Sequence, residues 1–326
     1  MDQNKVELDH EFHPFLRAYK NGYIERLIGS DIVSASIDPQ TGVSSKDVSI
    51  QNETGLSARL YIPKTISKHQ KLPLLIYFHG GSFLIESAFS SLYHQYVNSV
   101  VAEANVVAMS VEYRLAPEHP LPIAYNDSWD AIQWVDLHSK GEGSESWLKD
   151  YVDFDRVFLG GDSAGANIVH NMAMRAGEVE LKNCLKIHGI ILVQPYFWGA
   201  ERIGAEESDL VKRDLINKMW IYACPSTTGH DDPHINPVAP GAPSLCKLGC
   251  SRVLVLIAGE DVFRDRGLLY YETLRKCGWG GVVEVAETEG EDHVFHLTNP
   301  TCDKAISMIK SLASYMNQAN DSPTTK

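Results

Sequence analysis

The sequence FLGGDSAGAN, residues 158–167, lies between an apolar run and a run of helix-forming residues. Gly161, Ser163 and Gly165 fit the pattern G-x-S-x-G, which in a strand-to-helix context marks a sharp turn that exposes a serine hydroxyl. Such a turn brings two backbones close together, and side chains at 161 and 165 would obstruct their approach. The N–H groups that begin the following helix have no earlier carbonyl as partner and favour negative charge there. The stretch therefore predicts a nucleophilic serine beside oxyanion donors.

Glycine-rich corners also bind phosphate groups or dinucleotides in other proteins. Those turns carry more glycines and have no fixed serine at their centre. The corner at 161–165 places one serine between two glycines, directly after the apolar residues 156–160. We therefore interpret Ser163 as a nucleophile.

Continuous apolar runs predict the buried strands of a mostly parallel sheet. The runs are residues 72–80, 105–114, 156–160, 187–195 and 252–259, and residues 282–287 look like a sixth strand. Helical periodicity in the gaps places two sets of residues on single helix faces. The two sets are Ala124, Ser128, Ala131, Ile132 and Val135, and Ala305, Ile309, Leu312 and Met316. The alternation predicts a single α/β domain over residues 1–326, with helices on both faces of the sheet.

Two segments do not fit this alternation. Residues 1–45 precede it, and residues 197–248 carry proline, glycine and aromatic residues without clear periodicity. A long insertion between two core strands is more often a lid or a pocket wall than a plain connection. We expect both segments to form a cap over the sheet edge, and we expect the polar tail at 318–326 to be disordered.

A serine hydroxyl needs a general base, and the base needs an orienting acid. After a corner of this kind the acid precedes the histidine along the chain. Asp261 follows one apolar run and His293 follows the next, so both are expected on loops at the same sheet edge as Ser163. Three other residues remain alternatives, Glu260 and Asp265 for the acid and His296 for the base.

Ester chemistry at Ser163 also needs donors for the oxyanion that forms on an attacked carbonyl. His79, Gly80 and Gly81 come directly off the run at 72–78. Glycines allow the backbone amides at 80–82 to approach a substrate closely, so Gly80, Gly81 and Ser82 are candidate donors. The N–H of Ala164, in the corner itself, would complete the oxyanion hole. Taken alone, this glycine pair is equally consistent with an ordinary tight turn.

Composition restricts the function further. The formal net charge of −13 repels phosphate backbones and anionic membranes, so we expect no nucleic-acid partner. The N-terminal residues lack the apolar segment of a signal peptide, and no apolar run reaches the length of a membrane helix. The six cysteines contain no C-x-x-C pair, which favours free thiols over a metal site. We expect a cytoplasmic protein without membrane association.

These residues resemble the α/β-hydrolase fold, in the branch that includes hormone-sensitive lipase. The chain is also similar to the plant carboxylesterase family over about residues 14–315. The matching segments are 14–27, 38–48, 86–97, 111–122 (VEYRLAPEHPLP), 231–245 and 263–279. The resemblance implies a triad of Ser163, Asp261 and His293, an oxyanion hole at His79-Gly80-Gly81 and Ala164, and a cap. One departure is Ser82, where many relatives have a third glycine.

Members of this family also have other activities. Gibberellin receptors resemble the chain but lack the catalytic histidine, so His293 disfavours a pure receptor. 2-Hydroxyisoflavanone dehydratases resemble it closely and characteristically have threonine in place of the nucleophile, so Ser163 favours hydrolysis. Some dehydratases keep serine, and alkaloid cyclases of this branch use the scaffold for elimination.

Three hypotheses follow. The first is a serine carboxylesterase that needs no metal and no cofactor, because the nucleophile is a side chain and amides hold the oxyanion. The second is a lyase of plant specialised metabolism, such as a dehydratase, and the third is a small-molecule binding protein. Five aromatic residues are expected either to line a pocket for a phenolic or terpenoid substrate or to fill the core. They are Phe83, Tyr196, Phe197, Trp198 and Trp220.

Overall fold

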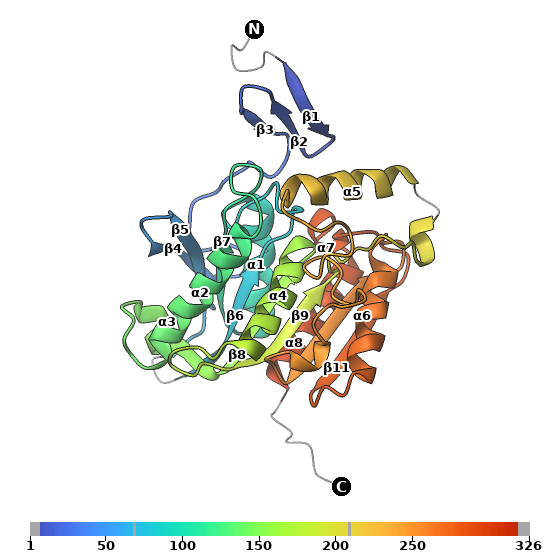
Figure 1. The fold of residues 1–326 in the computed structure, drawn as a ribbon. Coiled ribbons are helices and arrows are strands. Elements are labelled where there is room, and N and C mark those ends of the chain that lie inside the picture. The colour runs from blue at the N-terminus through green and yellow to red at the C-terminus, as the bar shows by residue number, and fades with distance from the viewer. Residues whose placement is uncertain (1–6, 68–69, 208–209, 319–326) are drawn as a thin grey trace.

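A twisted, mostly parallel sheet of eight strands forms the centre of the protein (Figure 1). This computed structural model describes residues 7–67, 70–207 and 210–318. The strand order is β11-β10-β9-β8-β6-β7-β5-β4. The strands are β4 (Ser44–Gln51), β5 (Leu56–Ile62), β6 (Leu72–Phe78), β7 (Val107–Glu112), β8 (Val152–Asp162), β9 (Ile187–Val193), β10 (Arg252–Ala258) and β11 (Val282–Thr288).

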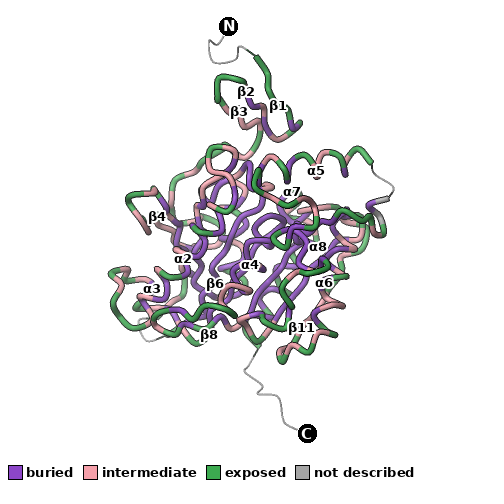
Figure 2. The backbone as a smooth tube through the Cα atoms, viewed as in Figure 1, coloured by how far each residue is buried: buried purple, intermediate pink, exposed green. Residues whose placement is uncertain are grey.

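The six predicted runs all form strands, and these six are parallel to their neighbours among them. Every residue of β6 is buried, as are nearly all residues of β9 and β10, because helices cover both faces (Figure 2). The expected α/β-hydrolase architecture is confirmed. The prediction did not include β4 and β5, which extend the sheet in antiparallel order.

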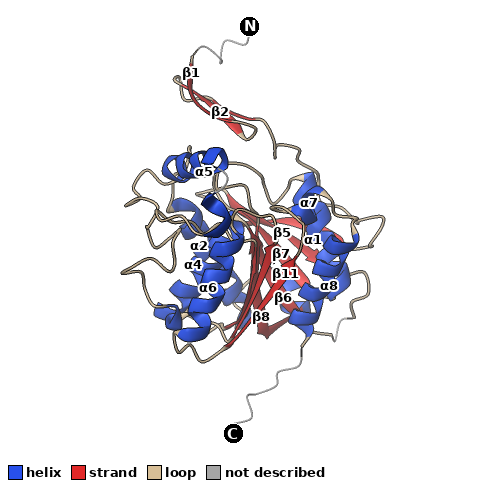
Figure 3. Cartoon of the chain, turned by 90° about the vertical axis from the view of Figure 1, so that its right-hand side faces the viewer, coloured by secondary structure: helices blue, strands red, loops and turns tan. Residues whose placement is uncertain are grey.

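Helices form a layer on each side of the sheet (Figure 3). One layer contains α1 (Ser91–Ala104), α7 (Phe295–Thr298) and α8 (Asp303–Asn317); the other contains α2 (Ile123–Ser139), α4 (Ala164–Glu178) and α6 (Arg264–Lys276), while α3 (Ser146–Tyr151) precedes β8. Both residue sets predicted to share a helix face are buried, the first on α2 and the second on α8. Apolar periodicity therefore identified the core-facing sides of these two helices.

The two segments outside the alternation have structure that the sequence pattern did not predict. Near the N-terminus, β1 (Leu8–Phe12), β2 (Leu16–Tyr19) and β3 (Ile24–Arg26) form a separate antiparallel sheet. The insertion 197–248 contains two short 3₁₀ helices, η1 (Gly204–Glu207) and η2 (Leu245–Lys247), and the helix α5 (Leu210–Ala223). Helix α5 lies across the end of the α/β core that faces the N-terminal sheet (Figure 1).

A buried ion-pair cluster attaches this insertion to the core. The Glu206 carboxylate is fully buried and accepts hydrogen bonds from Arg213 Nη1 at 2.7 Å and Arg266 Nε at 2.6 Å. Arg213 belongs to α5 and Arg266 to α6, so Glu206 bridges two elements far apart in the sequence. Buried charges of this kind are costly unless every member is paired. The pairing therefore holds α5 in a defined position.

Two further expectations concern the tail and the membrane. Of the tail predicted at 318–326, residues 319–326 lie outside the described residues. In the described parts of the chain, no helix combines the length and apolar character that a membrane crossing requires. All six cysteines are described, and all are free thiols.

Candidate active site

The predicted corner joins β8 to α4 with Ser163 at the junction. Ser163 has φ 51° and ψ −117°, a conformation that a residue with a side chain adopts only at a cost. A Cβ atom on Gly161 would lie 2.6 Å from the Phe78 carbonyl oxygen, and one on Gly165 would overlap the same oxygen. The two glycines are therefore required by the close approach of β6 and α4, as the sequence pattern predicted.

Ser163, His293 and Asp261 form a continuous hydrogen-bonded chain. The Nε2 atom of His293 lies 2.9 Å from Ser163 Oγ, and its Nδ1 atom lies 2.8 Å from Asp261 Oδ2. Asp261 also accepts the N–H of Phe263 at 3.0 Å, which fixes its carboxylate. The Asp261 side chain is 1% exposed and that of His293 is 23% exposed. The imidazole is thus held between a buried carboxylate and a hydroxyl that lines a cavity.

The environment of His293 favours its protonated form. Burial lowers the pKa of His293, but the charge of Asp261 and its hydrogen bond raise it. Asp162 and Asp292 act in the same direction, and the net result is a pKa above the ordinary value. This environment stabilises the imidazolium that forms when His293 accepts a proton from Ser163.

The alternative acid and base residues lie apart from this chain. His296 is fully buried, neither ring nitrogen has a hydrogen-bond partner among the described residues, and burial lowers its pKa to about 3. Asp265 pairs with Arg264 at 2.8 Å. The side chain of Glu260 is exposed. Asp261 and His293 are therefore the pair that the structure brings to Ser163.

Three of the four candidate oxyanion donors are available. The N–H groups of Gly81, Ser82 and Ala164 have no acceptor within the described chain. Gly81 and Ser82 have φ values of 100° and 54°, so the loop after β6 turns through left-handed conformations. A glycine adopts such conformations freely, whereas Ser82 does so at a steric cost.

Gly80 does not fit the prediction as a donor. Its N–H already donates to Tyr93 Oη at 2.8 Å, and both groups are buried. A Cβ atom on Gly80 would lie 2.9 Å from the same hydroxyl and 2.5 Å from Asp162 Oδ2. The glycine at 80 is thus required for packing against Tyr93 and Asp162. Sequence reasoning missed the hydrogen bond to Tyr93 because this residue comes from helix α1, outside the motif.

His79 packs against the same loop and, within the described chain, makes no hydrogen bond to Ser163, Asp261 or His293. Its ring stacks on Tyr113, with centroids 4.2 Å apart and an interplanar angle of 13°. The Tyr113 hydroxyl donates to the His79 carbonyl at 2.7 Å, and burial lowers the pKa of His79 to about 4. His79 is therefore a neutral side chain that supports the loop.

A cavity of about 430 Å³ opens beside Ser163 and His293. Segment 14–28 contributes Phe15 and Ile28 to its wall, and helix α5 contributes Ile216 and Met219. Apolar side chains make up most of the lining, and its acidic and basic members include Glu86, Asp162 and Lys212. A small cavity of this character suits an apolar substrate with few polar groups.

The sequence analysis expected five aromatic residues either to line a pocket or to fill the core, and the structure places most of them in the core. Tyr196 lines the cavity. The other four pack in the hydrophobic core, and they are Phe83, Phe197, Trp198 and Trp220. Core packing therefore accounts for most of them.

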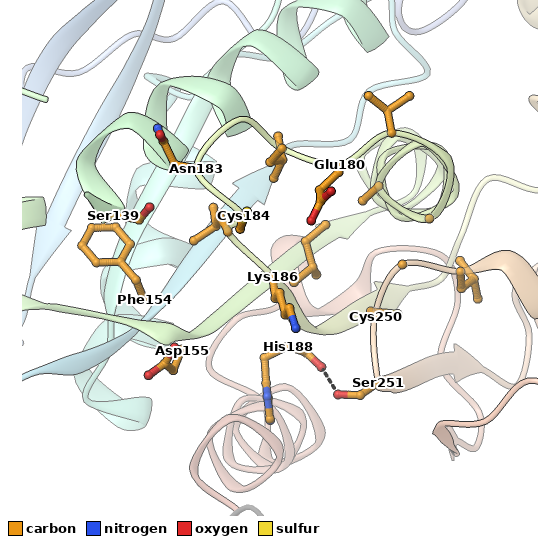
Figure 4. Close-up of a pocket in the computed structure, with 18 of the residues that line it drawn as sticks. Ser139, Phe154, Asp155, Glu180, Asn183, Cys184, Lys186, His188, Cys250 and Ser251 are labelled. Atoms are coloured by element: carbon orange, nitrogen blue, oxygen red, sulfur yellow. Dashed lines mark hydrogen bonds between the residues drawn. The ribbon is translucent and has the colours of Figure 1, made fainter. Parts of the chain in front are cut away.

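Figure 4 shows part of the lining of a larger cavity, of about 830 Å³, and Ser163 is not among the residues that line it. It adjoins the amino-terminal end of β9 and β10 and contains both His188 and Ser251. The Ser251 hydroxyl donates to the backbone carbonyl of His188 at 2.8 Å, so its proton is directed away from the imidazole (Figure 4). This serine and histidine do not form a nucleophile–base pair.

The sheet, the strand-to-helix serine and the histidine and aspartate on neighbouring loops have the arrangement of an α/β hydrolase. A family model of the alpha/beta hydrolase fold matches residues 75–297. The chain therefore belongs to the α/β-hydrolase family.

Known relatives include both esterases and dehydratases. The probable carboxylesterase 2 of Arabidopsis thaliana is 48% identical over 318 residues, which cover 98% of this chain and 99% of the relative. A 2-hydroxyisoflavanone dehydratase of Glycine max is 45% identical over 315 residues, which cover 95% and 99%. A solved structure, the hyperthermophilic esterase of the archaeon Pyrobaculum calidifontis, aligns with a TM-score of 0.68 and 25% identity over 83% of this chain and 84% of its own.

Proposed function

We propose that the protein is a serine carboxylesterase that hydrolyses small-molecule carboxylic esters. The observation that carries the proposal is the chain of short hydrogen bonds from Asp261 through His293 to Ser163, on an elbow that strains the serine. The carboxylesterase relatives, similar over nearly the whole chain, support the same activity.

In this mechanism Ser163 Oγ forms a bond to the ester carbonyl carbon while His293 Nε2 takes the hydroxyl proton. The N–H groups of Gly81, Ser82 and Ala164 stabilise the negative charge that develops on the carbonyl oxygen. Collapse of this intermediate breaks the ester C–O bond, and His293 returns the proton to the leaving alcohol. Water, activated by His293, then releases the acid and restores Ser163.

The shape of the site supports a substrate of limited size. The cavity volume and its apolar lining suit a compact hydrophobic ester, with phenolic or terpenoid groups among the candidates. We assign the described residues of segments 1–45 and 197–248 to a cap within a single domain, because segment 14–28 and α5 both line the cavity. Residues 1–6 and 208–209 of these two segments lie outside the described residues. The six free thiols support a reducing compartment, and we propose the cytoplasm.

Elimination is the second candidate reaction, and the dehydratase relative of Glycine max favours it. In that case His293 would abstract a proton beside a ketone, and the oxyanion donors would polarise the ketone oxygen. Ser163, with its hydroxyl bonded to the base, is the observation that favours hydrolysis instead.

The test is turnover of p-nitrophenyl butyrate by the wild type and by Ser163→Ala. We expect wild-type turnover and a decrease in kcat of about 10⁴-fold or more in the variant. In parallel, a 2-hydroxyisoflavanone is incubated with the wild type and the products are separated by chromatography. Dehydration without ester turnover would assign the protein to the lyases and contradict the esterase proposal.

A further inference from the structure

A buried hydrogen-bonded bridge connects the two segments that hold the oxyanion donors. The N–H of Gly80, in the loop after β6, donates to Tyr93 Oη at 2.8 Å. The Tyr93 hydroxyl in turn donates to Asp162 Oδ2 at 2.8 Å. Asp162 is the last residue of β8 and directly precedes Ser163. We call Gly80, Tyr93 and Asp162 the bracket.

Each end of the bracket is adjacent in sequence to the nucleophile or to a candidate oxyanion donor. Gly80 precedes Gly81, the first free donor of the loop, and Asp162 precedes Ser163 and Ala164. Tyr93 lies in the first turn of α1 and also lines the catalytic cavity. The bracket therefore joins two segments that are distant in sequence at the point where they flank the reacting carbonyl.

Burial and packing make this bridge rigid. Tyr93 is 2% exposed, and Asp162 and Gly80 are also buried. Burial raises the pKa of Tyr93 well above its usual value, so its hydroxyl keeps the proton that it donates to Asp162. The Tyr93 ring packs near the rings of His79 and Tyr77, with centroids 5.4 Å and 6.3 Å away. A hydroxyl held in this way accepts from Gly80 in one fixed direction.

A second tyrosine separates two possible roles of Tyr93. One role is to position the loop after β6, and the other is only to give the buried Asp162 carboxylate a hydrogen-bond partner. The Tyr77 hydroxyl donates to the other carboxylate oxygen, Asp162 Oδ1, at 2.6 Å. It gives Asp162 a hydrogen-bond donor, as Tyr93 does, but within the described chain it makes no hydrogen bond to the loop after β6. Tyr93 alone of the two therefore connects Asp162 to Gly80.

We propose that Tyr93 is a positioning residue that sets the separation between the loop donors, Gly81 and Ser82, and the Ser163–Ala164 corner. The proposal rests on the esterase function, because its consequence is the stabilisation of the tetrahedral oxyanion. Oxyanion donors act only when they lie at hydrogen-bond distance from the position of the developing charge. A displacement of about 1 Å at such a site can reduce the rate by about 100-fold.

The test compares Tyr93→Phe with the matched control Tyr77→Phe, using p-nitrophenyl butyrate. Each variant loses one hydroxyl bond to Asp162, but only Tyr93→Phe releases Gly80. We expect kcat to fall by about 10- to 100-fold in Tyr93→Phe with KM changed by less than about threefold, and kcat to change by less than about threefold in Tyr77→Phe. Equal decreases in both variants, or unchanged kcat in Tyr93→Phe, would overturn the proposal.

A transition-state analogue supplies a readout that general destabilisation would not reproduce. Ser163 Oγ adds to the carbonyl carbon of an alkyl trifluoromethyl ketone while His293 Nε2 takes the hydroxyl proton, and the ketone oxygen becomes an oxyanion in the oxyanion hole. We expect Tyr93→Phe to weaken inhibition by this ketone by the same factor as kcat, while inhibition by butyrate, the product acid, stays within about threefold. Parallel loss of both affinities would contradict a positioning role.

Two measurements test the role of Tyr93 even if Tyr93→Phe does not fold or the protein has no esterase activity. If Tyr93→Phe does not fold, amide hydrogen exchange in the wild type is measured instead. The Gly80 amide is expected to exchange at least about 100-fold more slowly than those of Gly81 and Ser82, and equal exchange rates would contradict the bracket. Absence of wild-type turnover contradicts the esterase function, and ketone binding to the two variants then still decides the role of Tyr93.

Discussion

Replacing Gly165 with alanine tests whether the close approach of α4 to the end of β6 holds the nucleophile in place. An alanine Cβ would lie 2.7 Å from the His79 carbonyl oxygen, about 0.7 Å short of the 3.4 Å at which ordinary contacts begin. It would also overlap the Phe78 carbonyl oxygen, which is backbone and has little freedom to move. The helix would therefore have to shift away from the loop after β6 by at least this amount.

The shift moves Ser163 and Ala164 relative to Gly81, so both attack and oxyanion stabilisation suffer. We expect kcat/KM for p-nitrophenyl butyrate to fall by about 100-fold, and overpacking to reduce the free energy of unfolding by about 1–3 kcal/mol. Gly280→Ala is the control, because a Cβ there meets nothing within 4 Å. Activity and Tm of Gly165→Ala close to those of the control would refute the steric account of the elbow.

Two other predictions concern the acid and the cap. In Asp261→Asn, burial still lowers the pKa of His293, but the main opposing charge is lost. We therefore expect the acidic limb of the kcat/KM pH profile to move to lower pH and the plateau to fall by about 10⁴-fold. An acidic limb at the wild-type pH would contradict this role of Asp261. In Glu206→Gln, the buried guanidinium groups of Arg213 and Arg266 lose their counter-charge. We expect the free energy of unfolding, measured by thermal denaturation, to fall by about 3–5 kcal/mol. An unchanged Tm would contradict the anchoring of α5 by Glu206.

Much of the fold could be predicted from the sequence because its strands are buried on both faces. Continuous apolar runs identify β6, β9 and β10 directly, since helices cover them on each side. Strand β4 is half-exposed at the sheet edge, and β1 is largely exposed, so neither carries such a run. Helix α5 was missed although its buried apolar residues Ile216, Met219, Trp220 and Ala223 have helical spacing, because this short face lies within a long insertion rich in proline and glycine.

In the site, too, the features that depend on local sequence could be predicted, and those that depend on tertiary contacts could not. The elbow at Ser163 could be predicted because glycines on each side of it are required by a close backbone approach. The loop positions of Asp261 and His293 follow from the order of the strands. The engagement of Gly80 could not be predicted, since its partner Tyr93 comes from another element and no local pattern encodes a tertiary hydrogen bond.

The most direct test of the account is the intact mass of the protein after treatment with an organophosphate. Ser163, activated by His293, is predicted to displace the leaving group and to retain one phosphoryl group, which peptide mapping locates at 163. The Ser163→Ala variant is predicted to gain no mass under the same conditions. A wild-type protein that stays unmodified, or an adduct that persists in the variant, would contradict the assignment of Ser163 as the nucleophile.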